Sequence, residues 1–376
     1  MGETLEIDQL RQQIDDLDIQ LVELLAKRQQ VTTAVGEYKR EVGKPIYDPV
    51  REAELIGKRR DLAASLNVEP DLIEDLLRRI MRESYQSQHN AYKNVFQENA
   101  KVVIVGGNGV LGRRFADMFK RSNYSVAVLE QQDWPQAQQI VADAKLVLIA
   151  VPINLTEQVI QQLPALADDC ILADLTSLKA APLNAMLQKH AGPVVGLHPM
   201  FGPDVPNFVK QVVVVCEGRE PSQYQWLLDQ IGLWGAVLQP DIAESHDTSM
   251  EIIQAMRHFT TYVYGQFIAK ENPDLKHLLR LSSPIYRLEL AMTGRLFAQD
   301  ASLYGDIIFG AENALALAEN FKDELDNAIE LLSSRDKQAF KQQFELVADW
   351  FGDKSDEFLQ ESKNLLKTAQ DSRDIK

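Results

Sequence analysis

Residues 102–119 have the sequence VVIVGGNGVLGRRFADMF, which decides the fold of the middle of the chain. A β-branched run is followed by Gly107, Gly109 and Gly112 in GxGxxG spacing, and then by a run with helical periodicity. Such glycines allow a tight turn and a close approach to a pyrophosphate at the helix N-terminus. The stretch therefore predicts a dinucleotide site. The other residues of the turn are further predicted cofactor contacts: Asn108, Val110 and Leu111.

The next β-branched run ends at Glu130, close to the roughly 20-residue offset at which an acid binds the ribose hydroxyls of NAD. The same carboxylate would repel the 2′-phosphate of NADP, so the sequence favours NAD as the cofactor. Val151 and Pro152, at the end of the third run, are predicted to line the same site. The alternative interpretation is a glycine turn that only packs a helix on a sheet, with Glu130 solvated.

Short β-branched runs alternate with helical segments through the middle of the chain. The predicted strands are residues 102–105, 126–129, 146–151, 171–175, 194–197 and 212–215. This alternation is typical of a mostly parallel sheet covered by helices on both faces. After about residue 245 the strand signals vanish. We expect a multidomain chain: an all-α domain of three helices (1–90), a linker (91–100), an α/β Rossmann-like NAD-binding domain (101–242) and an all-α C-terminal domain (243–376).

The first predicted helix, residues 5–40, carries an apolar stripe with steps of three and four. The stripe consists of Leu10, Ile14, Leu17, Leu21, Leu24, Val31, Val35 and Tyr38. At 1.5 Å per residue the helix is about 50 Å long, so we expect it to pair with a second copy. Arg28 fills the one gap in the stripe, where a charge needs a buried partner.

Two further helices are predicted in the first hundred residues. Asp48 and Pro49 provide an N-cap and a first helical position for a helix that runs to about residue 66. A third helix spans residues 70–88 and has a buried stripe that turns polar at Ser84 and Gln88. Polar groups on a buried stripe are candidates for a binding site.

Composition limits the function classes. A chain of 376 residues has room for two or three domains, and its net charge of −16 argues against a nucleic-acid or anionic-membrane partner. The start lacks a signal peptide, and no apolar run approaches the roughly 18 residues of a membrane span, so we expect a cytoplasmic protein. Two cysteines in apolar runs indicate no disulfide, and no zinc or EF-hand spacing occurs. An anionic substrate must therefore meet a local cationic cluster.

Helix geometry places two cations together. The eleven positions from Arg28 to Lys39 come within about 20° of full turns, so both side chains lie on one face and can bind one ligand. Arg11 is rotated by about 100° from Arg28 and cannot easily join them within its own helix. We expect it to reach a site on a partner chain instead.

Three strings carry a resemblance to a known family: DLTSLK at residues 174–179, GLHPMFGP at 196–203 and SSPIYRLELAMTGRLFAQD at 282–300. They closely resemble prephenate dehydrogenases. The first hundred residues are similar to the all-helical class of chorismate mutases, and the whole chain resembles the bifunctional chorismate mutase/prephenate dehydrogenases from end to end. The positions that match the mutase motif are Arg11, Arg28, Lys39, Asp48, Arg51, Glu52, Ser84 and Gln88.

For the front domain, the resemblance implies a mutase site shared across a dimer. The Claisen rearrangement of chorismate to prephenate needs a compact dicarboxylate and stabilisation of the ether oxygen, with no nucleophile or base. The arginines, Arg11, Arg28 and Arg51, would hold carboxylates. Lys39 and Gln88 would donate to the ether oxygen, and Glu52 with Ser84 would orient the ring hydroxyl or the pyruvyl end.

Two of these assignments have structural alternatives. Arg28 would serve equally in a buried ion pair, and the capping role of Asp48 suffices without substrate contact. Gln88 is informative because an amide donates at neutral pH, whereas a carboxylate must first be protonated. The sequence therefore predicts mutase activity that is flat through neutral pH.

For the second half, the resemblance implies NAD-dependent oxidative decarboxylation of prephenate to 4-hydroxyphenylpyruvate, in tyrosine biosynthesis. His198 lies at a strand end, where ligands of open α/β sheets bind, and would accept the ring hydroxyl proton. Ser177 would orient that hydroxyl or the nicotinamide. The remaining residues are predicted to bind the substrate or build its site: Arg295, Lys179, His246 and, more weakly, Arg287.

The resemblance also implies dimerisation through the C-terminal domain and inhibition by L-tyrosine. Fold alone does not fix the substrate, so an arogenate dehydrogenase or another NAD-dependent hydroxyacid dehydrogenase with a regulatory front domain is the main alternative. A non-enzymatic NAD-responsive regulator is a further one. The HPMFGP string, Arg295 and the attached mutase favour prephenate.

Overall fold

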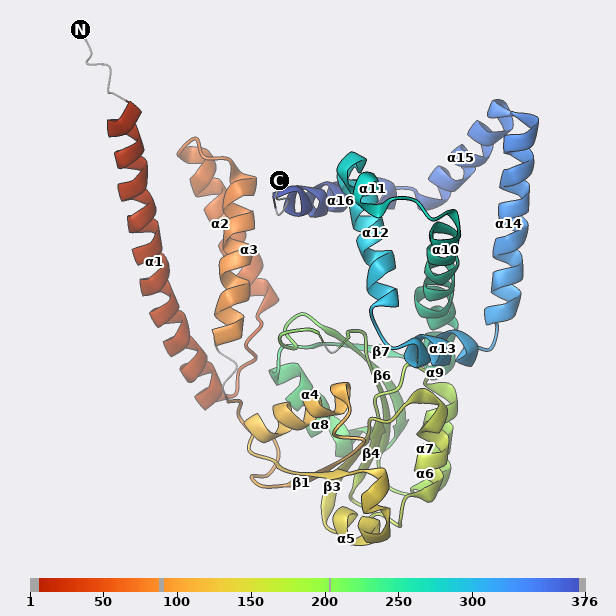
Figure 1. Ribbon diagram of the computed structural model, residues 1–376. Helices are drawn as coiled ribbons and strands as arrows, with labels where there is room; N and C mark the ends of the chain where they lie inside the picture. The colour runs from red at the N-terminus through yellow and green to blue at the C-terminus, as the bar shows by residue number, and fades with distance from the viewer. Residues whose placement is uncertain (1–6, 88–90, 203, 372–376) are drawn as a thin grey trace. The chain divides into compact units, whose positions relative to one another are not determined.

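A computed structural model describes residues 7–87, 91–202 and 204–371 of the chain (Figure 1). The chain divides into two compact units, Met1–Glu244 and Ser245–Lys376. The helical front domain and the sheet therefore belong to one unit. The predicted mutase residue Gln88 lies outside the described residues.

Three helices form the front domain: α1 (Ile7–Val42), α2 (Pro49–Ser65) and α3 (Pro70–Ser87). The carboxylate of Asp48 accepts a hydrogen bond from the backbone N–H of Arg51 at 3.0 Å, which confirms the predicted N-cap of α2. The apolar stripe of α1 faces solvent in the single chain, with Leu17 62% and Leu24 61% exposed. A helix that leaves such a stripe uncovered is typical of an interface between chains.

A seven-stranded sheet forms the centre of the first unit, in the order β2-β1-β3-β4-β5-β6-β7. The first five strands are parallel, and β6 pairs antiparallel with β5 and parallel with β7. Their bounds are β1 (Lys101–Val105), β2 (Ser125–Leu129), β3 (Ala144–Ile149), β4 (Ile171–Asp174), β5 (Val194–Pro199), β6 (Val212–Arg219) and β7 (Val237–Asp241).

The edge strand β7 was not predicted, because its sequence VLQPD is short and largely polar. Pro240 cannot donate to a ladder, and such residues are tolerated only at sheet edges or strand ends. The other six strands lie where the β-branched runs predicted them, within one or two residues for most of their ends.

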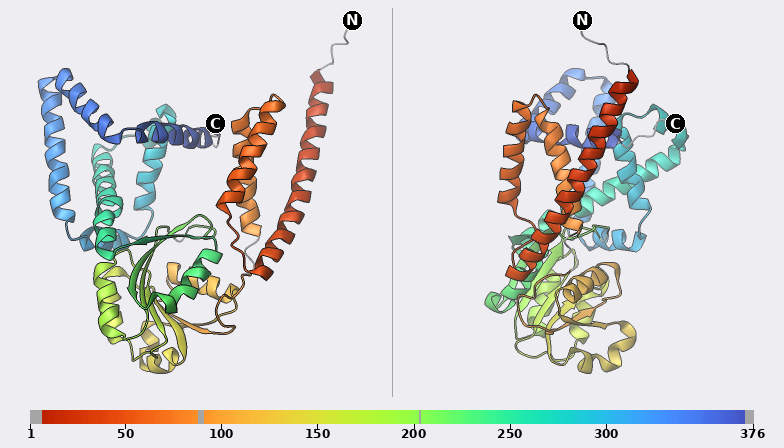
Figure 2. Two further views of the ribbon diagram at one scale, coloured as in Figure 1. Left: turned by 180° about the vertical axis from the view of Figure 1, so that it is seen from behind. Right: turned by 90° about the vertical axis from the view of Figure 1, so that its left-hand side faces the viewer.

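Side chains alternate between the two faces of the sheet along each strand, and this builds two apolar cores, one on each face. Val102 and Ile104 point into a cluster with residues of α4 (Val110–Arg121) and α8 (Pro221–Leu233). Val103 and Val105 point into the opposite cluster. Figures 1 and 2 show the helices that flank the two faces of the sheet. The elements on that second face are η1 (Gln131–Gln136), α5 (Ala137–Val141), η2 (Ile153–Leu155), α6 (Thr156–Gln162) and α7 (Ala180–Lys189). The structure is the predicted Rossmann-like α/β layer.

The elements of the second unit are all helices within its described residues. Its elements are α9 (Ala243–Met250), a π-helix, η3 (Glu251–Met256), α10 (Arg257–Glu271), α11 (Leu275–Leu281), α12 (Pro284–Phe297), α13 (Ala301–Gly310), α14 (Ala314–Ser334), α15 (Lys337–Phe351) and α16 (Lys354–Asp371). Several large apolar side chains are left uncovered, including Phe309 at 89% and Trp350 at 79% exposure. Among the described helices, none has the length and apolar character needed to cross a bilayer.

Candidate active sites

The glycine turn between β1 and α4 is closely packed. Gly106 has a φ of +77°, and a Cβ there would lie 2.6 Å from the carbonyl oxygen of Ala150. A Cβ on Gly112 would lie 2.5 Å from the carbonyl oxygen of Gly106. The turn therefore requires glycine at both positions. The predicted motif omitted Gly106, although the doubled glycine at 106–107 was a visible signal.

The strand order places this turn at a topological switch point. Strand β1 lies between β2 and β3, so the connections that follow β1 and β3 leave on opposite faces and open a crevice at their carboxyl ends. Gly107, Gly109 and Gly112 lie at the end of β1, and Val151 and Pro152 follow β3 directly. The structure thus brings the predicted cofactor residues of both segments together.

The first turn of α4 has no side-chain cap. Its N-cap, Gly109, provides no side-chain hydrogen bond to the helix. Backbone N–H groups at a helix N-terminus, together with the positive end of the helix dipole, suit a pyrophosphate. The residues of the turn therefore fit a dinucleotide.

Glu130 begins the connection after β2 and faces the glycine turn. Its Oε1 accepts a hydrogen bond from the backbone N–H of Asn108 at 2.8 Å. A reciprocal capping arrangement with Asp133 fixes the Glu130 backbone, whose N–H donates to Asp133 Oδ2 at 3.1 Å. The predicted ribose-binding carboxylate is thus held beside the turn that it was expected to serve.

Ser177 and His198 lie at the carboxyl ends of neighbouring strands, Ser177 just past the end of β4 and His198 in the last two residues of β5. Asp174 of β4 pairs with Gly196 of β5, so Ser177 follows β4 by three residues and His198 lies two residues past the pair. His198 is buried at 3% exposure, and Ser177 is half-buried. The structure therefore places both predicted groups at one edge of the sheet.

Lys179 connects the two strand ends. Its ammonium is fully buried, pairs with the buried carboxylate of Asp174 and donates to the carbonyl oxygen of Leu197 at 2.8 Å. Leu197 immediately precedes His198. An ammonium that is enclosed in this way suits a role in holding the two strand ends together. It suits the direct substrate contact that the sequence predicted for Lys179 less well.

The other predicted dehydrogenase residues belong to the second unit. His246 of α9 is buried at 1% exposure, and its Nδ1 lies 2.8 Å from Asp247 Oδ1. Arg287 and Arg295 are exposed on α12. Their proposed contacts with substrate stay predictions.

In the front domain, α1 and α3 meet through Arg28. Its Nη1 donates to the Ser84 hydroxyl at 2.9 Å, and that hydroxyl donates to the carbonyl of Ile80 at 2.8 Å. Burial lowers the pKa of Arg28, an effect partly offset by the nearby Tyr85. Arg28 is therefore partnered by a predicted site residue, and no carboxylate within the described residues forms an ion pair with it.

Lys39 lies on the same face of α1. Its Nζ donates to the carbonyl oxygen of Ile46 at 2.8 Å. Burial lowers its pKa, while Asp48 raises it and Lys44 lowers it further. Arg28 and Lys39 are both half-buried, whereas the residues around them on the apolar stripe are exposed. Both cations therefore lie on the covered side of α1, and their joint binding of one ligand stays a prediction.

Glu52 has more partners than sequence predicted. Its carboxylate is 7% exposed, accepts a hydrogen bond from the Tyr85 hydroxyl at 2.9 Å and lies 3.3 Å from Arg78 Nη1. Lys210, which precedes β6, approaches Glu52 Oε1 at 2.5 Å. No sequence pattern marked Arg78, Tyr85 or Lys210.

The remaining predicted mutase residues make fewer contacts in the single chain. Arg11 is exposed and pairs with Asp8 at 3.3 Å on its own helix, so the single chain does not bring it to Arg28. The side chain of Arg51 is exposed, and Asp48 serves as the helix cap. These positions agree with the expectation that part of the site comes from another chain.

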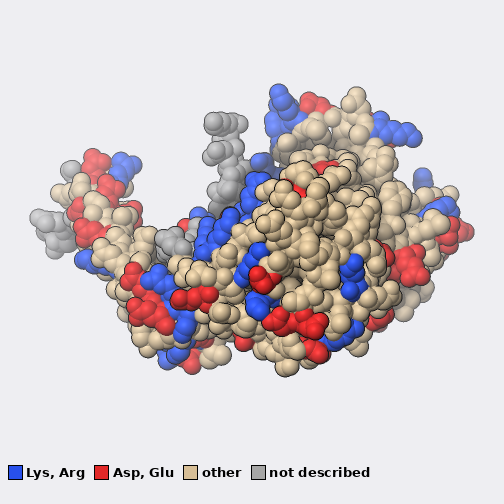
Figure 3. Space-filling view, turned by 90° about the horizontal axis from the view of Figure 1, so that it is seen from below, with Lys and Arg blue, Asp and Glu red and all other residues tan. Residues whose placement is uncertain are grey.

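Figure 3 shows Lys and Arg side chains gathered on part of the face seen from below, although the net charge of the chain is −16. Within the described residues, no three His, Cys, Asp or Glu side chains are grouped so that they would hold a metal ion.

Comparison with known proteins gives three family matches. Residues 10–89 match chorismate mutase type II, residues 120–237 match the prephenate dehydrogenase nucleotide-binding domain, and residues 242–346 match the prephenate dehydrogenase dimerization domain. The T-protein of Enterobacter agglomerans is 54% identical, over 98% of this chain and 99% of its own length. The T-protein of Haemophilus influenzae is 48% identical, over 96% and 97%.

A solved structure has the same fold over the larger part of the chain. The prephenate dehydrogenase of Aquifex aeolicus, in complex with hydroxyphenyl propionate and NAD+, aligns with a TM-score of 0.53 at 16% identity. The alignment covers 67% of this chain and 97% of that one.

Proposed function

The chain belongs to the T-protein family and is a bifunctional chorismate mutase and prephenate dehydrogenase of tyrosine biosynthesis, and from this premise we propose which residues perform each reaction. The supporting observation is that each half of the chain gathers its own set of polar groups. Arg28, Lys39 and Ser84 lie on facing surfaces of the front helices, and Ser177 and His198 lie at one edge of the sheet.

In the dehydrogenase site, His198 accepts the proton of the ring hydroxyl of prephenate on an imidazole nitrogen. NAD, held by the glycine turn and Glu130, would supply the acceptor for the hydride that leaves the carbon bearing the ring hydroxyl. Loss of the ring carboxylate as CO2 makes the ring aromatic, and the His198 imidazolium returns its proton to the phenolic oxygen. Ser177 orients the hydroxyl. Lys179 and Asp174 hold the two strand ends that carry these groups, so they act as positioning residues.

Residues of the second unit bind the negatively charged groups of the substrate. Arg295 binds a carboxylate of prephenate, since a guanidinium offers bidentate geometry. Arg287 is a weaker candidate for the same task, and His246 helps to build the site. The cofactor is NAD in preference to NADP, because Glu130 places a carboxylate beside the turn.

In the mutase site, Arg11, Arg28 and Arg51 bind the carboxylates of chorismate. Lys39 and Gln88 donate to the ether oxygen, where charge develops as the bond breaks. Ser84 and Glu52 hold the ring hydroxyl or the pyruvyl end. Arg11 comes from a second copy of the chain, because it lies apart from the others in the single chain.

The active form is a homodimer, paired through the α1 stripe and through the helical second unit. Both carry uncovered apolar side chains, and the second unit matches a dimerization domain. L-tyrosine, the end product, acts as a feedback inhibitor. Leu17→Glu with Leu24→Glu should weaken α1 pairing and lower mutase activity, measured by sedimentation velocity beside a chorismate assay; an unchanged dimer with full activity would refute pairing through α1.

Substrate choice is tested with two compounds that differ only at the side-chain carbonyl. We expect kcat/KM with NAD to be higher for prephenate than for arogenate. Faster turnover of arogenate would overturn prephenate as the substrate of the second half while leaving the mutase assignment intact.

A further inference from the structure

A lysine of the dehydrogenase half contacts a predicted mutase residue. Lys210 Nζ lies 2.5 Å from Glu52 Oε1, and both residues belong to the first compact unit. The ammonium also lies 5.1 Å from the centre of the Tyr47 ring, within reach of a cation–π interaction. Because Glu52 is 7% exposed and Lys210 41% exposed, the pair is partly shielded from solvent. Such a pair retains more of its attraction than a surface salt bridge.

The carboxylate of Glu52 has more acceptor positions than its three partners in the chain use. An ionised carboxylate has about four lone-pair sites. Lys210 and Arg78 approach Oε1, and the Tyr85 hydroxyl donates to Oε2. One acceptor position on Oε2 is therefore left for a substrate hydroxyl, while the cations hold the group in a single orientation.

The backbone of Lys210 is fixed by the dehydrogenase core. Its φ is +62°, an uncommon conformation for a residue other than glycine, and its N–H donates to the carbonyl of Gly235 at 2.9 Å. The preceding residues, Phe208 and Val209, are buried in the core at 2% and 7% exposure. The position of this lysine is thus set by packing in the sheet domain.

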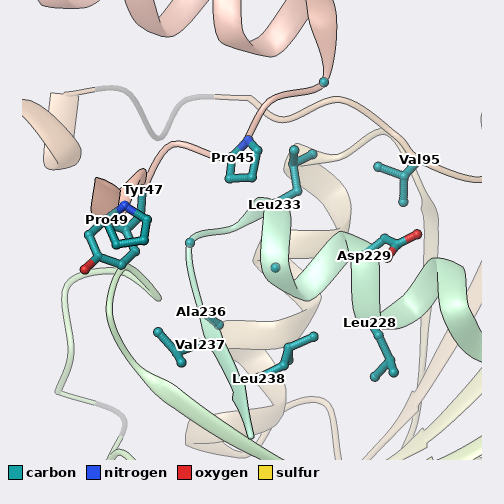
Figure 4. A pocket seen from close by; sticks show the side chains of 13 residues that line it. Pro45, Tyr47, Pro49, Val95, Leu228, Asp229, Leu233, Ala236, Val237 and Leu238 are labelled. Atoms are coloured by element: carbon teal, nitrogen blue, oxygen red, sulfur yellow. The ribbon is translucent and has the colours of Figure 1, made fainter. Parts of the chain in front are cut away.

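The neighbouring α1–α2 connection is attached to the same core. Ile46 is 7% exposed and belongs to the apolar cluster on the α4–α8 face of the sheet. Figure 4 shows the connection beside α8 and β7, where Pro45 and Tyr47 line a pocket of about 610 Å³ with Leu233 and Val237. Lys39, the predicted donor to the ether oxygen, donates a hydrogen bond to the carbonyl oxygen of Ile46. The mutase residues Glu52 and Lys39 thus contact Lys210 and Ile46, which the core of the dehydrogenase domain holds in place.

We propose that Lys210 is a positioning residue of the mutase site, which orients the Glu52 carboxylate for the substrate hydroxyl although it belongs to the dehydrogenase domain. The proposal rests on the role proposed above for Glu52. It makes the chorismate reaction depend on the segment between β5 and β6. Lys210 acts through Glu52, so its effect disappears when the Glu52 carboxylate is absent.

A double-mutant cycle in the full-length protein tests this dependence. Lys210→Met keeps the aliphatic stem and removes the charge, Lys210→Arg restores the charge, and Glu52→Gln removes the carboxylate charge. Loss of chorismate gives the mutase kcat/KM, and oxidation of added prephenate shows that the dehydrogenase domain is folded. Lys145→Met is the matched control, because Lys145 pairs with Asp169 at the same 2.5 Å and is 32% exposed in the same domain.

We expect Lys210→Met to lower the mutase kcat/KM roughly tenfold and Lys210→Arg to recover most of it. In the Glu52→Gln background, Lys210→Met should cost less than about twofold. Equal losses in both backgrounds, a silent Lys210→Met, or parallel loss of both activities would overturn the role of Lys210. A fully active Glu52→Gln variant would instead refute the role of Glu52, which is a separate failure.

Discussion

The carboxylate of Glu130 accepts a hydrogen bond from the backbone N–H of Asn108 at 2.8 Å, and so joins the carboxyl ends of β2 and β1. The glycine turn that suits a pyrophosphate and the acid that suits a ribose are therefore parts of one structure. A phosphate on that ribose would meet the negative charge of Glu130 directly.

Replacement of Glu130 by alanine should relax cofactor choice. We expect the ratio of kcat/KM for NAD to that for NADP to fall roughly tenfold or more, because the repulsive charge is lost. Steady-state kinetics with saturating prephenate measure the ratio. Asp133→Ala is the control, since it removes the reciprocal cap and keeps the carboxylate at position 130. An unchanged ratio in Glu130→Ala would rule out this role.

Lys39→Ala should abolish one activity and spare the other. Loss of a donor to the developing charge on the ether oxygen should lower the mutase kcat roughly 10²- to 10³-fold. Oxidation of added prephenate should stay near its original rate, because His198 and Ser177 lie at the carboxyl ends of β5 and β4 and Lys39 belongs to α1. Loss of both activities in folded protein would contradict two independent sites.

The same lysine sets the alkaline limit of the mutase. Burial lowers the pKa of Lys39, so the mutase kcat/KM should fall as pH rises through a value below the ordinary 10.5. Below that pH the ammonium is charged, and the profile should stay flat through neutrality. Lys39→Arg should remove the alkaline limb, because a guanidinium stays protonated there. A limb that persists in Lys39→Arg would assign it to another group.

His198→Asn gives the reverse separation. We expect prephenate oxidation to fall roughly 10²- to 10⁴-fold, as is usual when a general base is removed. Conversion of chorismate to prephenate should continue, so prephenate should accumulate. Product analysis by chromatography distinguishes this result from unfolding, in which neither compound would change.

Asp174→Asn tests the buried pair beneath the dehydrogenase site. Breaking a buried ion pair on one side should cost about 3–5 kcal/mol of unfolding free energy, because the Lys179 charge is left without compensation. Denaturant unfolding measures the loss. Adding Lys179→Met should recover stability but not the full kcat, since the link to Leu197 is gone. Full dehydrogenase kcat in the stable double variant would show that the pair has no positioning role.

Much of the fold was predictable because local pattern and tertiary structure agree. Strands buried on both faces are continuous β-branched runs, and the glycine turn has its own spacing. The α1 stripe predicted a partner and is exposed in the chain. Strand β7 was missed because an edge strand needs no apolar run, and its sequence, VLQPD, contains only a short apolar segment.

The site was predictable only in part. Residue types on one helix face can be worked out from 100° per residue, which placed Arg28 with Lys39. Contacts such as Lys210 with Glu52 join positions 158 residues apart and leave no local signal. Lys179 shows the same limit, since its sequence position suggested a substrate contact and its burial depends on how β4 and β5 pair.

The most direct test of the central claim is NADH absorbance on mixing the purified protein with NAD and chorismate, and separately with NAD and prephenate. Two coupled sites in one chain predict NADH formation from both compounds, with release of CO2. Formation from prephenate alone would contradict an active front domain, and formation from neither would contradict the dehydrogenase assignment as well.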